Sequence, residues 1–149
     1  MDIEWQWGTL GELPLRRLYS VLALRQAVFV VEQASLYQDL DGLDFDAMHL
    51  VGESPTELAA YLRVLGPNTR YQEPSIGRVV VAPAFRGTGV GRVLFGKGLE
   101  YTLGRYPGQA VRIGAQAHLQ KYYGSFGFVV DGEPFIEDGI PHVYMLRNG

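Results

Sequence analysis

The residues most suggestive of chemistry are three closely spaced glycines in the segment RGTGVGRVL, Arg86 to Leu94. Gly87, Gly89 and Gly91 follow an apolar, β-branched run that ends at Pro83, and they precede a segment that we predict to be helical. A strand, a glycine turn and a helix in this order bring unpaired backbone amides and the positive end of a helix dipole to one point. Such a point binds phosphate, so the segment predicts an anion site.

Two common nucleotide motifs do not fit this segment. The dinucleotide pattern G-x-G-x-x-G fails because its third glycine would fall on Arg92. The triphosphate pattern can be laid over Gly91 to Gly98, but the hydroxyl that should reach magnesium is then missing, because Gly98 occupies that position. The pattern that remains is R-x-x-G-x-G, met by Arg86, Gly89 and Gly91.

A second motif lies downstream, in the segment YYGSFGF, Tyr122 to Phe128. Together the two motifs resemble the GNAT superfamily of N-acetyltransferases, whose coenzyme A pyrophosphate loop has the first pattern and whose last helix carries an aromatic-Tyr-x-x-x-Gly-Phe signature. Further segments resemble small members of this superfamily in order along nearly the whole chain: LRQAVFVVEQ (24–33), YQDLDG (37–42), AYLRVL (60–65), GAQAHLQKYYGSFGF (114–128) and EDGIPH (137–142).

This resemblance implies one α+β domain over residues 1–149, layered α/β/α, with a splayed central mixed sheet of six to seven strands and about four helices. The sequence patterns indicate where these elements lie. Helices are expected at 13–29, 89–103 and 119–125, and strands at 48–52, 58–65, 76–82, 111–115, 128–130 and 142–146. The strand 76–82 reads as buried on both faces. The acids Asp39, Asp41, Asp44 and Asp46 indicate a solvated loop.

Composition limits the class of protein. Of the 149 residues, 47% are hydrophobic and 19% charged, as in a globular domain. A net charge of -3 argues against nucleic-acid binding by phosphate neutralisation. The chain has no cysteine, as is usual in a reducing compartment, so a cytoplasmic location is expected. No apolar run approaches the ~18 residues of a membrane helix. Three scattered histidines predict no metal site. The oligomeric state is open, with a homodimer as one alternative.

The resemblance also implies how acetyl-CoA binds as co-substrate. Its pantetheine arm would pair with the backbone of Val79, Val80 and Val81, in a gap between strands 76–82 and 111–115. Its pyrophosphate would lie on the loop formed by Arg86, Gly87, Thr88, Gly89, Val90, Gly91 and Arg92, with Lys97 as a further cation. Many members of the superfamily carry an asparagine seven residues before the tyrosine, where this chain has Gln116.

Acyl transfer to an amine requires a neutral amine, and an alkyl amine of pKa ~10.4 is almost fully protonated at neutral pH. The candidate bases are Glu32, His49 and His118, although Glu32 could equally pair with Arg25 and His49 could equally be structural. Tyr123 resembles the family's general acid, which protonates the leaving sulfur. A backbone amide near Val81 would stabilise the oxyanion. Arg25, Arg63 and His118 are assigned to the acceptor site.

Three functions compete at this point. The first is an N-acetyltransferase that moves an acetyl group from acetyl-CoA to a primary amine of a small molecule or peptide, by direct attack in a ternary complex. The second is a coenzyme A-binding regulatory module without turnover. The third is an acyltransferase with a longer acyl donor. No nucleic-acid or membrane partner is expected in any of them.

Overall fold

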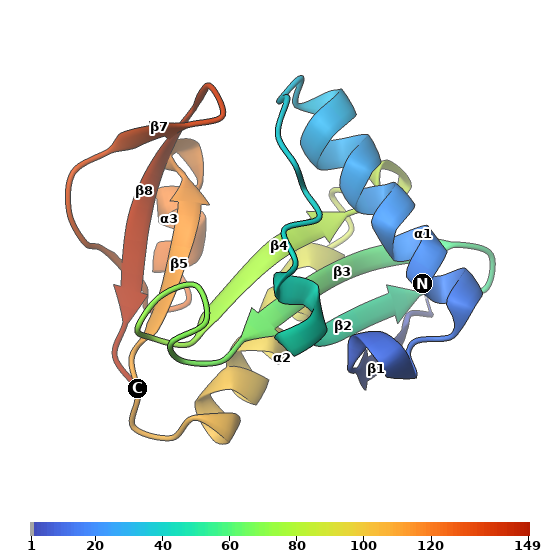
Figure 1. Ribbon diagram of the computed structural model, residues 1–149, viewed down its shortest axis with the longest axis horizontal. Helices are drawn as coiled ribbons and strands as arrows, with labels where there is room; N and C mark the ends of the chain where they lie inside the picture. The colour runs from blue at the N-terminus through green and yellow to red at the C-terminus, as the bar shows by residue number, and fades with distance from the viewer. Residues whose placement is uncertain (1) are drawn as a thin grey trace.

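Eight strands form one mixed β-sheet in the computed structural model, which describes residues 2–149 (Figure 1). The sheet order is β1-β2-β3-β4-β5-β8-β6, with β7 paired to β8. The strands are β1 (Glu4–Gly8), β2 (Met48–Glu53), β3 (Leu58–Leu65), β4 (Ser75–Val81), β5 (Val111–Gln116), β6 (Val129–Val130), β7 (Phe135–Glu137) and β8 (Ile140–Arg147).

The sheet divides into two halves between β4 and β5. These two strands are parallel and share one residue pair, Ser75 with Arg112. A backbone hydrogen bond from the Arg112 N–H to the Pro74 carbonyl, 3.0 Å long, reinforces this end. Beyond it the strands diverge, and Figure 1 shows them separating toward the top of the view. All other neighbours in the sheet are antiparallel.

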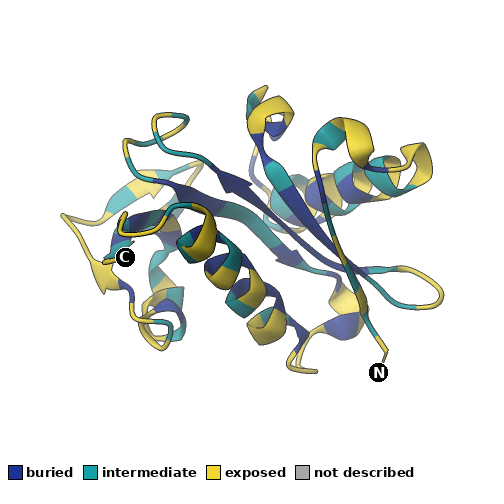
Figure 2. Ribbon diagram, turned by 90° about the horizontal axis from the view of Figure 1, so that it is seen from below, coloured by how far each residue is buried: buried dark blue, intermediate teal, exposed yellow. Residues whose placement is uncertain are grey.

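Helices cover both faces of the sheet. The α-helices are α1 (Leu15–Arg25), α2 (Val90–Arg105) and α3 (Gln120–Gly124), and α1 continues as a π-helix over Gln26–Glu32. Short 3-10 helices occupy Leu10–Glu12, Leu43–Asp46, Pro83–Phe85 and Ala117–Leu119. In Figure 2 the helices turn exposed surface outward and buried surface toward the strands. This is the layered arrangement that a sheet with two apolar faces requires.

Side chains of β3 alternate between two apolar clusters. Leu62 packs with Leu94 and Phe95 of α2, whereas Tyr61 packs with Val21 of α1 on the opposite face. All five side chains are buried. This period of two is the one expected of a strand covered on both faces, and it makes β3 the centre of the core.

A bulge bends β4 where it begins to leave β5. Tyr61 pairs with Val80 and Arg63 pairs with Gly77, so one residue of β3 lies opposite two of β4. Arg78, inside this bulge, has a φ of 50°. A bulge increases the local twist of a strand, which helps to carry β4 away from its parallel neighbour.

The predicted α+β fold with a splayed mixed sheet is confirmed. The structure adds two strands that the pattern analysis missed, β1 and β7. The helix expected at 13–29 is α-helical only to Arg25 and then widens into the π-helix. The strand expected to be buried on both faces, now β4, is partly exposed at four of its seven residues: Gly77, Arg78, Val79 and Val81. It borders a cavity there, as described below.

Two glycines of α2 differ in what surrounds them, and this predicts opposite effects on stability. A Cβ on Gly98 would lie 2.7 Å from Cδ2 of the buried Leu62, whereas a Cβ on Gly104 meets nothing within 4 Å. We expect Gly98→Val to lower the free energy of unfolding by about 1–3 kcal/mol through overpacking. Gly104→Ala should raise it by about 0.5–1 kcal/mol, because alanine favours the helix. Urea denaturation measures both, and equal effects would contradict this packing.

Candidate active site

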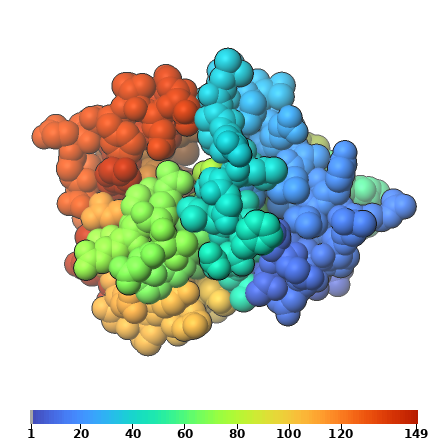
Figure 3. Space-filling model, viewed as in Figure 1, coloured from blue at the N-terminus to red at the C-terminus, as the bar shows by residue number. Residues whose placement is uncertain are grey.

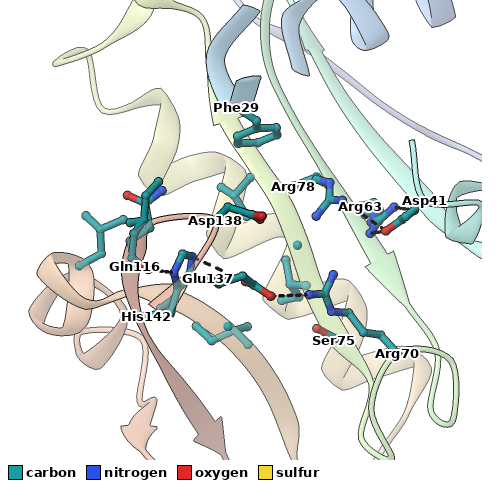
Figure 4. Close-up of a pocket in the computed structure, with 18 of the residues that line it drawn as sticks. Phe29, Asp41, Arg63, Arg70, Ser75, Arg78, Gln116, Glu137, Asp138 and His142 are labelled. Carbon is teal, nitrogen blue, oxygen red and sulfur yellow. Dashed lines mark hydrogen bonds and ion pairs between the residues drawn. The ribbon is translucent and has the colours of Figure 1, made fainter. Parts of the chain in front are cut away.

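The diverging strands β4 and β5 enclose a cavity of about 430 Å³ (Figure 4). Ile76, Gly77 and Val79 of β4 line one wall and Gly114 to Gln116 of β5 line the other. Beyond Ser75 no residue of β4 pairs with β5 in the described part of the chain. The cavity is therefore bordered by a strand edge whose backbone groups are available to an extended ligand.

A glycine loop lies where β4 leads into α2. Gly87 and Gly89 have φ values of 76° and 88°, in the left-handed region that favours glycine, and both are exposed. Gly89 is the N-cap of α2 and has no side chain to cap the helix, and a side-chain hydrogen bond at this end runs from the Val90 N–H to the Thr88 hydroxyl oxygen, 3.4 Å long. The Thr88 hydroxyl donates a 2.5 Å hydrogen bond to the Phe85 carbonyl, which fixes the turn. The leading amides of a 16-residue helix thus border an open loop, a favourable place for an anion.

Tyr123 of α3 lies against the cavity and is buried. Its ring packs edge-on against Phe95, with 5.0 Å between ring centroids. Burial, together with the neighbouring Tyr122, raises the pKa of the Tyr123 hydroxyl well above its usual value. The phenol therefore keeps its proton at neutral pH and can donate it to a group formed inside the cavity.

Most of the predicted side chains near the glycine loop are exposed and form their contacts at the protein surface. The Arg86 guanidinium pairs with the Glu32 carboxylate at 2.9 Å, and neither side chain lines the cavity. The Arg92 guanidinium donates to Ser125 Oγ at 2.9 Å and lies over the Phe126 ring, 4.7 Å from its centroid. Gln116 does line the cavity, at the end of β5.

His49 is fully buried in β2, outside the cavity. Its Nε2 donates to the Asp44 carbonyl at 2.9 Å, so its Nδ1 is free to accept from the Tyr61 hydroxyl, 2.6 Å away. Burial lowers the pKa of the imidazole and keeps it neutral. With both nitrogens bonded inside the protein, His49 cannot reach a substrate, which contradicts its prediction as a catalytic base. Its role is structural.

A buried ionic network joins three arginines of α1, β3 and β4 to the loop that precedes β2. Arg25 binds Asp39 at 2.9 Å and Asp44 at 2.7 Å. Arg63 binds the same Asp44 at 3.0 Å and Asp41 at 2.6 Å. The third arginine, in the β4 bulge, lies 2.7 Å from Asp39 and 3.3 Å from Asp41: Arg78. Three positive and three negative charges thus balance each other, as the buried charges of Arg25, Arg63, Asp39 and Asp44 require.

This network corrects two predictions. Asp39 and Asp44 are buried, so the solvated loop predicted for the acidic segment holds only for its exposed acids, Asp41 and Asp46. Arg25 has no exposed surface. Arg63 borders the cavity, but its terminal nitrogens donate hydrogen bonds to Asp41 and Asp44. Neither arginine is therefore available to bind an acceptor as predicted. Their spacing to the acids along the chain gave no sign of pairing, because the partners are 14 to 22 residues apart.

The other two histidines, His118 and His142, lie on opposite sides of the cavity boundary from what was expected. His118 is exposed and does not line the cavity, whereas His142 of β8 does line it, together with Glu137 and Asp138. The sequence patterns do not predict these three residues as site candidates. The available signal was the Asp-Gly pair in EDGIPH, which is typical of a tight hairpin turn. Such a turn would have placed Glu137 and His142 on adjoining strands.

Two further properties of residues 2–149 bear on function. No group of three or more histidine, cysteine, aspartate or glutamate side chains in this range could hold a metal ion. No helix there is long and apolar enough to cross a membrane.

Comparisons with known proteins agree with this geometry. A family described as "Acetyltransferase (GNAT) domain" matches residues 19–147. The chain is 48% identical over 147 residues to the protein ElaA of Escherichia coli, covering 97% of this chain and 96% of that protein. It is similar to the crystal structure of E. coli ElaA, with a TM-score of 0.92 over 99% of this chain and 100% of that chain. An acyl-CoA N-acyltransferase from Pseudomonas aeruginosa has the same TM-score of 0.92 at 42% identity, covering 98% and 99%.

The ionic network predicts a specific dependence of stability on Asp44. Burial opposes its ionisation, but the hydrogen bond from Arg25 and the charges of Arg25 and Arg63 outweigh burial and lower its pKa. We expect Asp44→Asn to lower the free energy of unfolding at pH 7 by about 3–5 kcal/mol, because two buried arginines lose a partner. Asp46→Asn, an exposed change in the same segment, should have little effect. Urea denaturation of both variants checks this.

The same variant predicts a change with pH. A carboxyl whose pKa is lower in the folded state stabilises the protein above its unfolded pKa of ~3.9, and this contribution is lost as the pH falls through the folded value. The stability difference between wild type and Asp44→Asn should therefore narrow as the pH drops below about 4. A difference that stays constant in acid would contradict the pairing of Asp44.

Proposed function

Because the chain belongs to the GNAT superfamily, as an ElaA-like member, we propose that it transfers an acetyl group from acetyl-CoA to a primary amine. The reaction is a direct attack in a ternary complex, and the acceptor is a small molecule or the amine of a peptide. The observation that carries this proposal is the unpaired edge of β4, which faces a cavity that also contains the Tyr123 side chain.

The donor binds along β4 in this proposal. Amide-containing pantetheine pairs with backbone groups near Val79 and Val81, much as an added strand would. The pyrophosphate lies at the loop of Gly87 to Arg92, where the first amides of α2 and the helix dipole favour negative charge. Acetyl-CoA is an extended chain with a dianionic centre, so both features match its chemistry.

The chemistry needs no metal. The neutral amine attacks the thioester carbonyl carbon, a C–N bond forms, and the carbonyl oxygen gains negative charge that a backbone amide near Val81 stabilises. When the C–S bond breaks, the departing sulfur takes the proton of the Tyr123 hydroxyl, and the nitrogen of the new amide releases its surplus proton, which returns the Tyr123 oxygen to its phenol form. A thiol of pKa ~8.5 is already a tolerable leaving group, so this proton transfer accelerates the reaction without being indispensable.

The first experiment is thiol release from acetyl-CoA across a panel of amines: butylamine, benzylamine, cadaverine, lysine and the dipeptide Ala-Ala. Calorimetry measures the heat of coenzyme A binding in parallel. Heat of binding together with amine-dependent thiol release supports the proposal. Heat without release from any amine would instead favour a coenzyme A-binding module, and no heat would remove both. Competition among acyl-CoA chain lengths tests the choice of acetyl as donor. A cytoplasmic location belongs to the same proposal and rests on the cysteine-free composition.

The glycine loop predicts a loss of donor affinity on substitution. Gly89 has a φ of 88° at the N-cap of α2, and any other residue there costs about 1–3 kcal/mol in this conformation. If the loop must keep this shape to bind pyrophosphate, Gly89→Ala should weaken coenzyme A binding about tenfold or more. Calorimetry measures the affinity, with Gly104→Ala as the helical control. Unchanged affinity in Gly89→Ala would place the pyrophosphate elsewhere.

Tyr123 predicts a reduced turnover rather than its loss. We expect Tyr123→Phe to lower kcat about 10²-fold, toward the lower end for general acids, while the KM for acetyl-CoA changes little. Because burial raises the pKa of this phenol, the deficit should be constant from about pH 6 to pH 9. Tyr101→Phe, in α2 but outside the cavity and stacked on Trp7, is the matched control. An unchanged kcat in Tyr123→Phe would remove Tyr123 from the mechanism.

A further inference from the structure

The β7–β8 hairpin brings two titratable side chains into the cavity that the donor site does not use. Glu137 and His142 both line it. Phe135 lies directly opposite His142 in the hairpin register, and Glu137 is two residues further along β7, so all three side chains share one face. Glu137 and His142 are therefore diagonal neighbours across two strands.

A tight turn fixes this arrangement. Glu137 pairs with Ile140, and the two residues between them, Asp138 and Gly139, have φ values of 51° and 77°. Two positive φ values in a two-residue loop are those of a type I′ turn, which matches the twist of paired strands. The turn is tied across the cleft by a 3.2 Å hydrogen bond from Ser35 Oγ to the Asp138 carbonyl. Figure 3 shows the two segments meeting there, in cyan and red.

The hydrogen bonds of His142 settle which ring nitrogen carries the proton. Its Nδ1 lies 2.7 Å from the Ile140 carbonyl oxygen, and because a carbonyl only accepts, Nδ1 is the donor. In the neutral ring Nε2 then holds the lone pair. This atom faces the Glu137 carboxylate, with 3.8 Å between Nε2 and Oε2. Figure 4 shows Glu137 between His142 and Arg70, whose guanidinium lies 3.5 Å from the other carboxylate oxygen.

Two acceptors facing each other at 3.8 Å lack a donor between them. An ammonium nitrogen has three N–H groups, and it can lie within the ~2.7–3.2 Å hydrogen-bond range of both atoms at once. We propose, resting on the acetyl transfer proposed above, that Glu137 and His142 form the subsite for the acceptor's ammonium group and that His142 Nε2 takes its proton. The acceptor is thus a cationic alkyl amine.

The proton passes from the acceptor's ammonium group to the imidazole of His142. An N–H bond of the ammonium breaks, its electron pair stays on nitrogen, and the proton forms a bond to His142 Nε2. The resulting imidazolium donates to the Ile140 carbonyl and faces the Glu137 carboxylate, so its charge is stabilised on both sides. The amine lone pair is then available for the thioester carbon. The proton leaves to water at the cavity mouth, where the Glu137 side chain is 41% exposed.

The other charged groups that face this subsite either have partners of their own or add negative charge to it. Arg70 holds one oxygen of Glu137. Asp41, Arg63 and Arg78 line the cavity but belong to the ionic network. The Asp138 carboxylate adds negative charge on the same wall. The titratable tyrosines around the cavity are Tyr37, Tyr71 and Tyr123, all neutral near pH 7 because burial raises their pKa values.

The first test is the pH dependence of His142→Gln. With the fastest amine of the panel, kcat/KM should fall about 10²-fold near neutral pH, the loss typical of a general base. The deficit should shrink as the pH approaches the amine's own pKa of ~10.4, because the free amine no longer needs a base. Coenzyme A binding by calorimetry should stay as in wild type. A deficit equal at every pH, or no deficit, would overturn the role of His142.

The second test measures binding without turnover. In the protein loaded with coenzyme A, butylammonium chloride should shift the His142 Hε1 resonance in the proton NMR spectrum, and 1-butanol should not. Glu137→Gln should abolish the shift and raise the KM of the amine, whereas Glu133→Gln, exposed and outside the cavity, should do neither. No shift in wild type would overturn the subsite. A shift with no acetyl transfer to any amine would support the subsite and refute the proposed function.

Discussion

The divergence of β4 from β5 is the constraint on which the rest of the structure depends. A parallel pair normally continues its hydrogen bonds for the length of both strands, yet here one residue pair is made and the ladder stops. The bulge at Arg78 turns β4 aside, and the two halves of the sheet then hold the walls of a cavity apart. Unpaired backbone inside a protein is costly, so an opening of this kind persists only where the surrounding packing enforces it.

Packing on both sides enforces the opening. On the β4 side, the ionic network ties the bulge residue Arg78 to the loop of Asp39 and Asp41, and through Arg25 to α1. On the β5 side, the antiparallel pairing with β8 continues over six residue pairs. The network therefore acts on the site from a distance: it contributes no group to the chemistry, but it holds in place the strand that does. Its three arginines are positioning residues.

Which parts of the structure could be predicted from the sequence depends on whether the interactions that form them are local along the chain. β3 and the strand–loop–helix of β4 and α2 were predictable, because apolar alternation and glycine spacing are local signals. β7 was missed, since a strand of three residues is too short to show alternation and only the Asp-Gly pair of its turn marks the hairpin. The burial of Asp39, Asp44 and His49 was also hidden, because it depends on partners from other strands and helices that only tertiary structure brings together.

The same distinction separates the two halves of the candidate site. The donor half consists mainly of backbone, and backbone binding requires glycines and strand edges whose sequence signature is short and contiguous. In the proposal, the acceptor half consists of side chains from the π-helix, the β3–β4 loop and the β7–β8 hairpin, so its composition can change without disturbing the fold. In the proposed function, this construction allows the acceptor to change while the donor site stays the same. In the proposed subsite the acceptor is recognised by Glu137 and His142, and Glu137 lies on β7, which contributes no residue to the hydrophobic core.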